Sequence, residues 1–335
     1  METDNKVNTI SIAMCTYNGS KYLAEQLDSI FRQTRQPDEI VICDDCSKDD
    51  TVELAKTLLN NWGGKYSLVQ NKKNLGFVKN FEKAIGLCHG DIIFLSDQDD
   101  VWDVRKIDIM IQTFEKHPEA AMIFHDSELV DQNLNLLYPS FWKNTLDFDY
   151  QLFFKHDYKK LYAGNIVQGS ASAIKKCVYQ KAVPFPLDAF HDEWLALVAL
   201  TIGEIVPVPQ TLMKYRQGNN ELGGMPRFSH TIINDLVRKM GKKYNEDINK
   251  YQRQLNALSS FIDCYEITNK NYPIDLIDYY DFLKNRIVSI TSKKIKQVFL
   301  FKQYKKYYYN YKQCYLKDVF EILFRKKEKI KENKQ

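Results

Sequence analysis

The first hundred residues alternate short apolar runs that suit β-strands with amphipathic segments that suit α-helices, and this order constrains the fold more than any other feature. The expected strands cover residues 9–14, 39–43, 66–69 and 92–95. Between the first two strands, Leu23, Leu27 and Ile30 recur at helical spacing. Strands separated by helices pair in parallel, with helices on both faces of the sheet. The sequence therefore predicts an α/β fold built on a mostly parallel sheet.

The middle third of the chain continues this pattern less regularly. We expect further strands over residues 121–125, 166–174 and 204–209, with a helix over 194–200. Just after residue 220 two glycines and a proline, Gly223, Gly224 and Pro226, interrupt the chain, and a Lys- and Tyr-rich stretch follows. Closely spaced glycine and proline residues indicate a loop or a break between structural elements. We therefore expect one domain over residues 1–220 and a basic, Tyr-rich helical region over residues 221–335.

Polar residues follow three of the expected strands at the point where each strand ends. Thr-Tyr-Asn at 16–18 follows the first strand, Asp-Asp at 44–45 follows the second, and Asp-Gln-Asp-Asp at 97–100 follows the fourth. In parallel sheets, ligands bind beyond the carboxyl ends of the strands. We therefore expect these three loops to converge on one ligand-binding crevice.

The acidic run at 97–100 requires a positive partner. Carboxylates this close repel one another, and the crowding raises their pKa values. Because alternate residues of an extended segment point the same way, Asp97 and Asp99 can face one ligand together. Oxygen ligands of this kind suit Mg²⁺ or Mn²⁺, which also bind substrate phosphates. A solvated acidic turn is the alternative interpretation, but the position directly after an apolar strand favours a cation site.

Four segments in the same order resemble a known enzyme family. They are CTYNG at 15–19, VICDDCSKDDT at 41–51, NLGFVKNFEKAI at 74–85 and FLSDQDDVW at 94–102. Together they resemble the inverting family 2 glycosyltransferases of the GT-A fold. The DQDDVW variant, with HDEWL at 191–195, is most similar to bacterial rhamnosyltransferase-like members. The resemblance covers about residues 8–220 and implies a Rossmann-like, mostly parallel mixed sheet flanked by helices, here with a C-terminal helical extension.

The resemblance also implies which residues bind the nucleotide diphospho-sugar donor. The implied donor-binding residues are Thr16, Tyr17, Asn18, Asp45, Lys79, Asp97 and Arg216. Tyr17 would contact the pyrimidine, Asp45 would accept a hydrogen bond from the base, and Asp97 would touch the ribose. Lys79 would reach the diphosphate, with a solvated position on a helix face as the alternative interpretation. Arg216 would also reach it, although the histidine that family members often carry just after the Arg-Gln pair is absent here.

For the metal, the resemblance implies Mn²⁺ or Mg²⁺ held by Asp99, with Asp97 and Asp100 beside it. Such an ion stabilises the charge that grows on a departing nucleoside diphosphate. Direct displacement by an acceptor hydroxyl also requires a base, and Asp192 occupies the place of the family's catalytic aspartate. A helix N-cap is the alternative interpretation of Asp192, and one residue can do both.

Two neighbours of that motif carry further expectations. His191, next to Asp192 in the sequence, is expected to orient the carboxylate. Gly169 and Ser170, just before a strand-like run, are expected to border a bound sugar.

The charge distribution suggests where such an enzyme would work. Residues 293–335 hold 14 Lys/Arg against 4 Asp/Glu, whereas the other residues hold 33 against 39. A basic, amphipathic segment binds anionic lipid, so we expect a peripheral membrane contact; packing against the main domain is the alternative. The acidic body excludes a nucleic-acid partner.

The remaining composition favours a cytoplasmic enzyme. The start METDNKVN is no secretory signal, no run of about 18 apolar residues is present, and the 7 scattered cysteines suit a reducing compartment. We therefore expect a cytoplasmic protein that contacts the inner face of the cell membrane.

The sequence thus predicts a metal-dependent inverting glycosyltransferase of bacterial surface polysaccharide assembly. The donor would be a dTDP- or UDP-sugar, with rhamnose as one candidate sugar, and the acceptor a glycan or lipid-linked glycan. One alternative is a nucleotidyltransferase, which would need a Gly-rich basic loop where CTYNG stands. A phosphohydrolase would need an aspartate in place of Thr16 or Tyr17. A non-catalytic sugar-nucleotide-binding protein would not need Asp192.

Overall fold

The computed structural model describes residues 8–146, 148–154, 158, 161–162, 165–217, 243–265 and 275–292. Contacts divide these residues into two compact units. The first contains the described residues up to 154 and from 165 to 217, and the second contains residues 158, 161–162, 243–265 and 275–292. The expected boundary near residue 220 lies outside the described residues.

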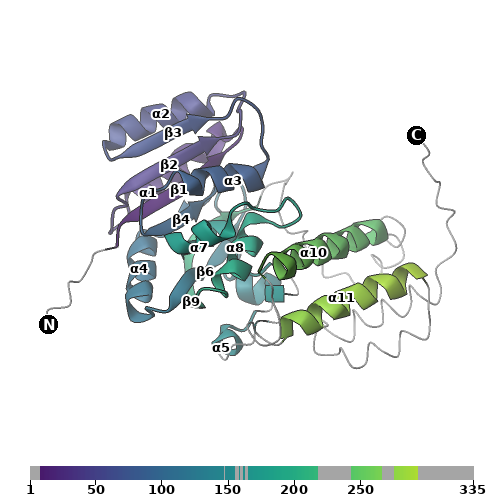
Figure 1. The fold of residues 1–335 in the computed structure, drawn as a ribbon. Coiled ribbons are helices and arrows are strands. Elements are labelled where there is room, and N and C mark those ends of the chain that lie inside the picture. Colours follow the sequence, from purple (N-terminus) through teal and green to yellow (C-terminus); the bar gives the residue numbers. More distant parts are fainter. Residues whose placement is uncertain are drawn as a thin grey trace. The chain divides into compact units, whose positions relative to one another are not determined.

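The first unit is built on one mixed sheet (Figure 1). Its strands are β1 (Ile10–Thr16), β2 (Glu39–Asp44), β3 (Tyr66–Gln70), β4 (Ile92–Ser96), β5 (Val101–Trp102), β6 (Ala120–Val130), β7 (Leu136–Tyr138), β8 (Ser172–Lys175) and β9 (Glu204–Arg216). They lie in the order β3-β2-β1-β4-β8-β6-β9-β5, with β7 paired to β6. The first four strands pair in parallel, β6 and β9 also pair in parallel, and β8 is antiparallel to both its neighbours.

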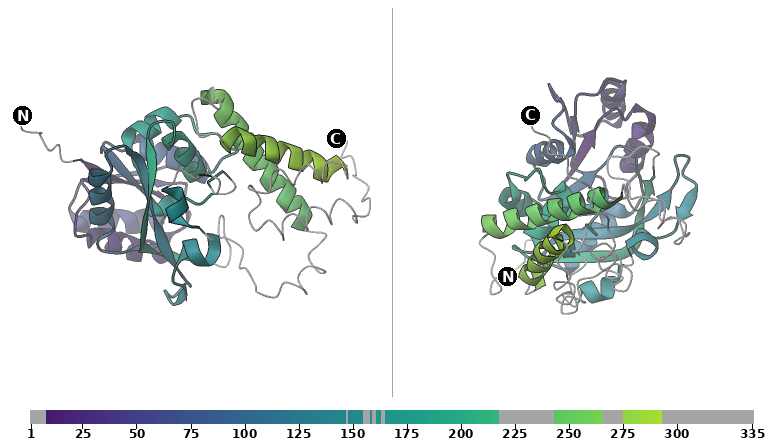
Figure 2. Two further views of the ribbon diagram at one scale, coloured as in Figure 1. Left: turned by 90° about the horizontal axis from the view of Figure 1, so that it is seen from below. Right: turned by 90° about the vertical axis from the view of Figure 1, so that its right-hand side faces the viewer.

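Helices cover both faces of this sheet (Figure 2). The helices of the first unit are α1 (Ser20–Phe31), α2 (Thr51–Trp62), α3 (Phe77–Gly86), α4 (Lys106–Lys116), α5 (Tyr150–Phe153), α7 (Lys176–Ala182) and α8 (His191–Ala199), with short turns η1 (Trp142–Leu146) and η2 (Gly169–Ala171). Buried apolar residues of α1, α2 and α4 pack with β1, β2 and β4 in one cluster. Helices α3, α7 and α8 pack against one another and against the sheet.

The predicted fold class is confirmed, and the first four strands lie where the sequence placed them. Strands β2 and β4 are buried along their whole length, as expected for strands covered on both faces. The strand expected over 166–174 is shorter, because residues 169–171 form the η2 turn and pairing begins only at Ser172. The last strand continues to Arg216, because it pairs with β6 and then also with β5.

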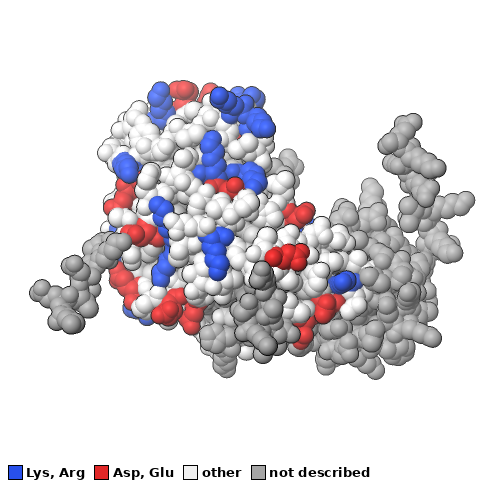
Figure 3. Space-filling view, in the orientation of Figure 1, with Lys and Arg blue, Asp and Glu red and all other residues white. Residues whose placement is uncertain are grey.

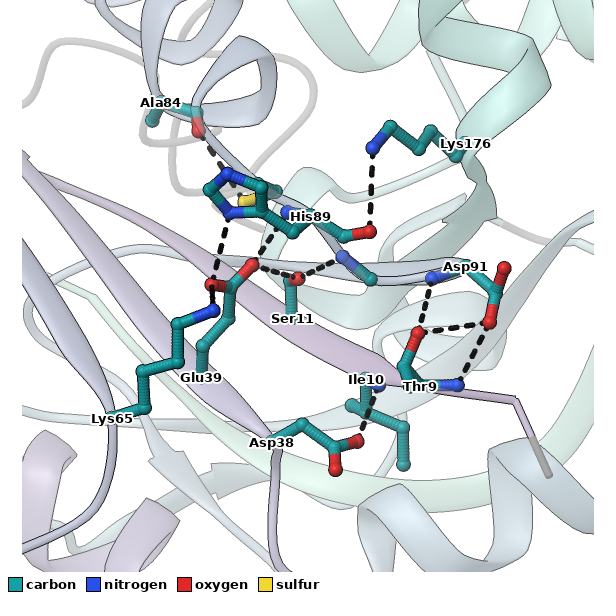
Figure 4. Close-up of polar contacts among 12 residues, drawn as sticks. Thr9, Ile10, Ser11, Asp38, Glu39, Lys65, Ala84, His89, Asp91 and Lys176 are labelled. Carbon is teal, nitrogen blue, oxygen red and sulfur yellow. Dashed lines mark hydrogen bonds and ion pairs between the residues drawn. The ribbon is translucent and has the colours of Figure 1, made fainter.

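A polar network fixes the amino-terminal ends of the strands, opposite the predicted site (Figure 4). The buried Glu39 carboxylate accepts hydrogen bonds from the Ser11 hydroxyl (2.6 Å) and the His89 amide (2.5 Å). It also pairs with Lys65 Nζ at 3.0 Å. Burial opposes ionisation of Glu39, but these partners outweigh it and lower its pKa to about 2. The network therefore anchors one end of the sheet with a charged side chain.

The second unit contains two helices that pack together, α10 (Lys243–Tyr265) and α11 (Asp275–Ser292). Phe261 and Phe282 are buried within it. The helical region expected after residue 220 is thus present in part, whereas the basic residues 293–335 lie outside the described residues. Basic and acidic side chains are intermixed on the face of the first unit in Figure 3. In the part of the chain that the structure describes, no helix is long and apolar enough to cross a membrane.

Candidate active site

The loops after β1, β2 and β4 are joined by hydrogen bonds at the carboxyl edge of the sheet. Thr16 and Asp44 are paired residues of neighbouring strands, and the Thr16 hydroxyl donates to Asp44 Oδ1 at 2.9 Å. The Asp45 amide donates to the Thr16 carbonyl at 2.8 Å. The convergence of these loops, expected from strand order, is therefore present.

A side chain from the acidic loop holds the loop after β1. The Tyr17 amide donates to Gln98 Oε1 at 2.8 Å, and Gln98 Nε2 donates to the Tyr17 carbonyl at 3.1 Å. Asn18 adopts a left-handed conformation with φ 48°, and its Oδ1 accepts from the Lys48 amide at 2.8 Å. Tyr17 itself is 44% exposed. The backbone of this loop is thus fixed while the Tyr17 side chain faces solvent.

Asp45 is buried and organises the loop before α3. Its Oδ1 accepts from Asn71 Nδ2 (2.9 Å) and the Leu75 amide (2.7 Å), and its Oδ2 accepts from the Gly76 amide (2.9 Å). A carboxylate has about four lone-pair positions. Three protein donors therefore leave one position, on Oδ2, for a further donor.

The acidic loop brings three carboxylates together. Burial, together with the nearby charges of Asp99 and Asp192, raises the pKa of Asp97 to about 7. Burial also raises the pKa of Asp100, with Asp99 and Asp97 adding to the effect, and raises that of Asp99 against the opposing charge of Arg216. Asp100 is fully buried, yet its Oδ2 has no hydrogen-bond partner. This crowding is the arrangement that a bound cation would stabilise.

The described residues contain no group of three or more His, Cys, Asp or Glu side chains that could hold a metal ion. Magnesium is commonly bound through one or two carboxylates together with substrate phosphates. The acidic loop, with its unpartnered carboxylate oxygen, suits binding of that kind.

Arg216, at the end of β9, braces the acidic loop. Its Nε donates to the Asp99 carbonyl at 2.8 Å, and its amide donates to Asp100 Oδ1 at 3.3 Å. The rest of the guanidinium donates to the Glu25 carboxylate and the Gln132 carbonyl, over the Tyr22 ring. Each guanidinium nitrogen therefore has a protein partner.

Lys79 also has protein partners. Its Nζ lies 2.7 Å from Glu82 Oε2 and 2.7 Å from the Phe185 carbonyl oxygen. In this structure Lys79 therefore ties α3 to the segment before α8.

Asp192, in the first turn of α8, belongs to the same site as the acidic loop. Its charge raises the pKa of Asp97, and the pKa of Tyr215 is raised by burial and by Asp192 together with all three loop acids. Asp192 Oδ2 accepts from the Gly169 amide at 3.0 Å. The acidic loop and Asp192, the predicted catalytic base, are about ninety residues apart in the sequence and thus face a common region.

The expectation that His191 orients Asp192 is wrong for this structure. The buried His191 ring stacks on Phe81 with 3.9 Å between centroids, and neither ring nitrogen has a hydrogen-bond partner. Consecutive residues of a helix do not face each other, so His191 cannot hold the side chain that follows it. The Gly169 backbone takes that role instead.

Sequence reasoning missed the roles of Gln98 and Lys106. Gln98 stands between two of the acids, and Lys106 occupies a buried position on the apolar face of α4. The role of Lys106 could have been recognised from its helical spacing, because it falls on the same helix face as the apolar residues Ile107, Met110 and Phe114.

Sequence comparison shows which known proteins this chain is similar to. Residues 11–177, about half of the chain, match the family model Glycosyl transferase family 2. The dTDP-rhamnosyl transferase RfbG of Shigella flexneri is 31% identical over 138 residues, which is 40% of this chain and 45% of that protein. The chain spans 58% of the length of the first curated relatives it matches.

Two solved structures share the fold. TarS residues 1–349 from S. aureus, in complex with UDP-GlcNAc, has a TM-score of 0.54 and 16% identity, over 85% of this chain and 92% of that one. The mannosyltransferase PcManGT from Pyrobaculum calidifontis, in complex with GDP-Man and Mn²⁺, has a TM-score of 0.55 and 15% identity, over 95% and 86%. With the family model and the named relatives, they bear out the resemblance seen in the motifs: this chain belongs to glycosyltransferase family 2.

Proposed function

We propose that this protein is a metal-dependent inverting glycosyltransferase that moves a sugar from a nucleotide diphospho-sugar to an acceptor hydroxyl in bacterial surface polysaccharide assembly. The observation that carries the proposal is the electrostatic contact between Asp192 and Asp97. It supports a leaving-group site and a catalytic base that would share one region, as direct displacement at the anomeric carbon requires.

The donor would lie across the ends of β1, β2 and β4. The exposed Tyr17 ring would contact the base, with Thr16 and Asn18 shaping its loop, and Asp45 would use its remaining Oδ2 position for a base N–H. Asp97 would bind the ribose. The complexes of TarS with UDP-GlcNAc and of PcManGT with GDP-Man support this donor class, and the similarity to RfbG favours a dTDP-sugar such as dTDP-rhamnose.

Asp99 would hold Mn²⁺ or Mg²⁺, with Asp97 and Asp100 beside it, and the Mn²⁺ in PcManGT supports this choice. When bound, the ion supplies positive charge for the departing diphosphate. Lys79 and Arg216 are the proposed basic residues near that group, and each would exchange one protein partner for a phosphate oxygen.

Asp192 would accept the proton of the attacking hydroxyl at one carboxylate oxygen. The Gly169 amide holds Oδ2 at 3.0 Å and so sets the direction of the carboxylate. Positioned bases of this kind contribute about 10²–10⁴-fold to rate. The acceptor would be a glycan or a lipid-linked glycan, and the basic residues 293–335 would bring the enzyme to an anionic membrane surface at the cytoplasmic face.

The test begins with a thermal-shift screen of the full chain against UDP-, dTDP- and GDP-sugars with Mn²⁺. The donor that stabilises the protein is then incubated with glycan and lipid-linked acceptors, and nucleoside diphosphate release is measured. NMR of the product shows whether the anomeric configuration inverts. Donor binding without release in the presence of any acceptor would favour a non-catalytic binding protein, and release of pyrophosphate would favour a nucleotidyltransferase.

A further inference from the structure

The first residue of α4, Lys106, is a fully buried lysine beneath the acidic loop. Its exposed fraction is 0%, and its Nζ donates to the Ser170 carbonyl at 2.5 Å. Nζ also lies 3.6 Å from the centre of the Trp102 ring. Burial lowers the pKa of Lys106, and the nearby carboxylates of Asp100 and Asp97 oppose that shift; His125 is also nearby.

This position is costly for an ammonium group. Lysine is almost never fully buried unless it is paired, because an unpaired charge loses its hydration. The neighbouring α4 residues Ile107, Met110 and Phe114 are buried and apolar, so a nonpolar side chain would suit the same helix face. The lysine is therefore explained by its polar neighbours and not by the packing of α4.

Those neighbours contact both the acidic loop and Asp192, the predicted catalytic base. The η2 turn accepts the Lys106 hydrogen bond at Ser170, and the preceding residue, Gly169, donates its amide to Asp192. The Ser170 side chain lies beside Asp97 and Asp100 and lowers the pKa of both, although its hydroxyl makes no hydrogen bond of normal geometry. One three-residue turn thus contacts the acids, the lysine and the base.

The turn has little freedom to move toward α8. A Cβ built on Gly169 would lie 2.7 Å from His191 Nε2 and 3.5 Å from Asp192 Oδ2. The backbone therefore approaches α8 more closely than a side chain at residue 169 allows.

We propose that Lys106 is a positioning residue that holds the η2 turn beneath the acidic loop, and through the Gly169 amide sets the Asp192 carboxylate against the donor site. This inference rests on the proposed function. It assigns Lys106 no contact with substrate; the residue acts through Ser170 and Gly169.

Two substitutions in the full chain test the inference. Lys106→Met keeps the stem of the side chain and removes both its charge and its donor, whereas Lys106→Gln removes the charge and keeps an N–H donor. The matched control is Lys175→Met, because Lys175 Nζ also donates to a carbonyl, that of Pro118, at 2.5 Å from an exposed position. For each variant we would measure kcat, donor KM, affinity for nucleoside diphosphate with Mn²⁺, and the unfolding temperature.

We expect Lys106→Met to lower kcat at least 100-fold while nucleotide affinity changes less than 10-fold, because the turn positions the base more than the nucleotide. Lys106→Gln should recover at least 10-fold of that loss, and Lys175→Met should match the wild type. A kcat of Lys106→Met within threefold of wild type would overturn the inference. So would parallel losses of kcat, nucleotide affinity and unfolding temperature in both Lys106 variants, since these indicate general destabilisation. A wild-type protein that releases no nucleoside diphosphate defeats the proposed function itself.

Discussion

Gln98 and Tyr17 form a reciprocal pair, in which one side-chain amide satisfies both the N–H and the C=O of a single backbone residue, at 2.8 and 3.1 Å. Gln98 belongs to the acidic loop and Tyr17 to the loop after β1. The pair therefore links the acidic loop, proposed to bind the metal, to the Tyr17 loop, proposed to contact the base of the nucleotide. A Cβ on Gly19 would lie 2.0 Å from Gln98 Oε1, so a side chain at residue 19 would displace the Gln98 amide from its place beside Tyr17.

Gln98→Leu should raise the donor KM about 10-fold with a smaller effect on kcat. Two hydrogen bonds worth about 1 kcal/mol each are lost, and the Tyr17 loop is released. Steady-state kinetics with varied donor measures the change. Gln112→Leu is the control, because Gln112 Nε2 donates to its helix neighbour Asp108 at an exposed site, at 3.0 Å. An unchanged donor KM would show that the pair does not position the donor.

Asp192→Asn should lower kcat at least about 100-fold and leave nucleotide affinity within threefold of wild type. Asparagine keeps an oxygen acceptor for the Gly169 amide but cannot take a proton at neutral pH. Calorimetry with nucleoside diphosphate and turnover assays separate the two effects. Asp28→Asn, at an exposed α1 carboxylate paired with Arg32, is the control. Turnover equal to wild type would eliminate Asp192 as the base.

Asp99→Ala should abolish the increase in nucleotide affinity that Mn²⁺ produces, and EDTA should have the same effect on the wild type. The measurement is calorimetry with and without the metal, which does not depend on turnover. Asp108→Ala removes a half-buried α4 carboxylate that bonds Gln112 and should keep the metal response. A full Mn²⁺ response in Asp99→Ala would place the ion elsewhere.

Gly169→Ala should lower kcat strongly, because the added methyl group would lie 2.7 Å from His191 Nε2 and must displace the turn or the ring. Truncating the ring should relieve the clash, so His191→Ala in the Gly169→Ala background is expected to recover part of the activity. A double-mutant cycle of kcat values measures this coupling. Strictly additive losses would mean that the two residues act separately.

Glu39 should make stability fall in acid. Its pKa in the folded protein is about 2, below its ordinary value of 4.5, so its contribution is complete above about pH 4.5 and is lost as the pH falls toward 2. The shift corresponds to at most about 3 kcal/mol. Urea unfolding between pH 7 and pH 3 should show a steeper loss for the wild type than for Glu39→Gln. Parallel curves would mean that the Ser11, His89 and Lys65 contacts do not stabilise the ionised form.

The local parts of this structure could be predicted from sequence, whereas the long-range contacts could not. The apolar runs predicted β1 to β4 because strands buried on both faces are continuous in hydrophobicity. Strand order then placed Thr16, Asp45 and Asp97 at one edge. The pairing of Ser172 with β4 and β6 depends on partners far away in sequence, and the strand expected over 166–174 was therefore too long.

In the candidate site, too, local features could be predicted from sequence and long-range contacts could not. The acids at 97–100 were visible because like charges rarely cluster without a partner. Arg216 was predicted as a diphosphate ligand from its charge and from the resemblance of its segment to the family, and the structure shows it bonded to the Asp99 carbonyl and the Glu25 carboxylate. No local pattern reveals that three backbone and side-chain acceptors surround one guanidinium. The partners of Lys79 could not be predicted for the same reason, since the Phe185 carbonyl that accepts its hydrogen bond lies 106 residues away in the sequence.

Every residue proposed for donor binding or proton transfer belongs to the first unit, and α10 and α11 contribute none of them. Substitutions in these two helices can therefore accumulate without altering any side chain proposed for the reaction.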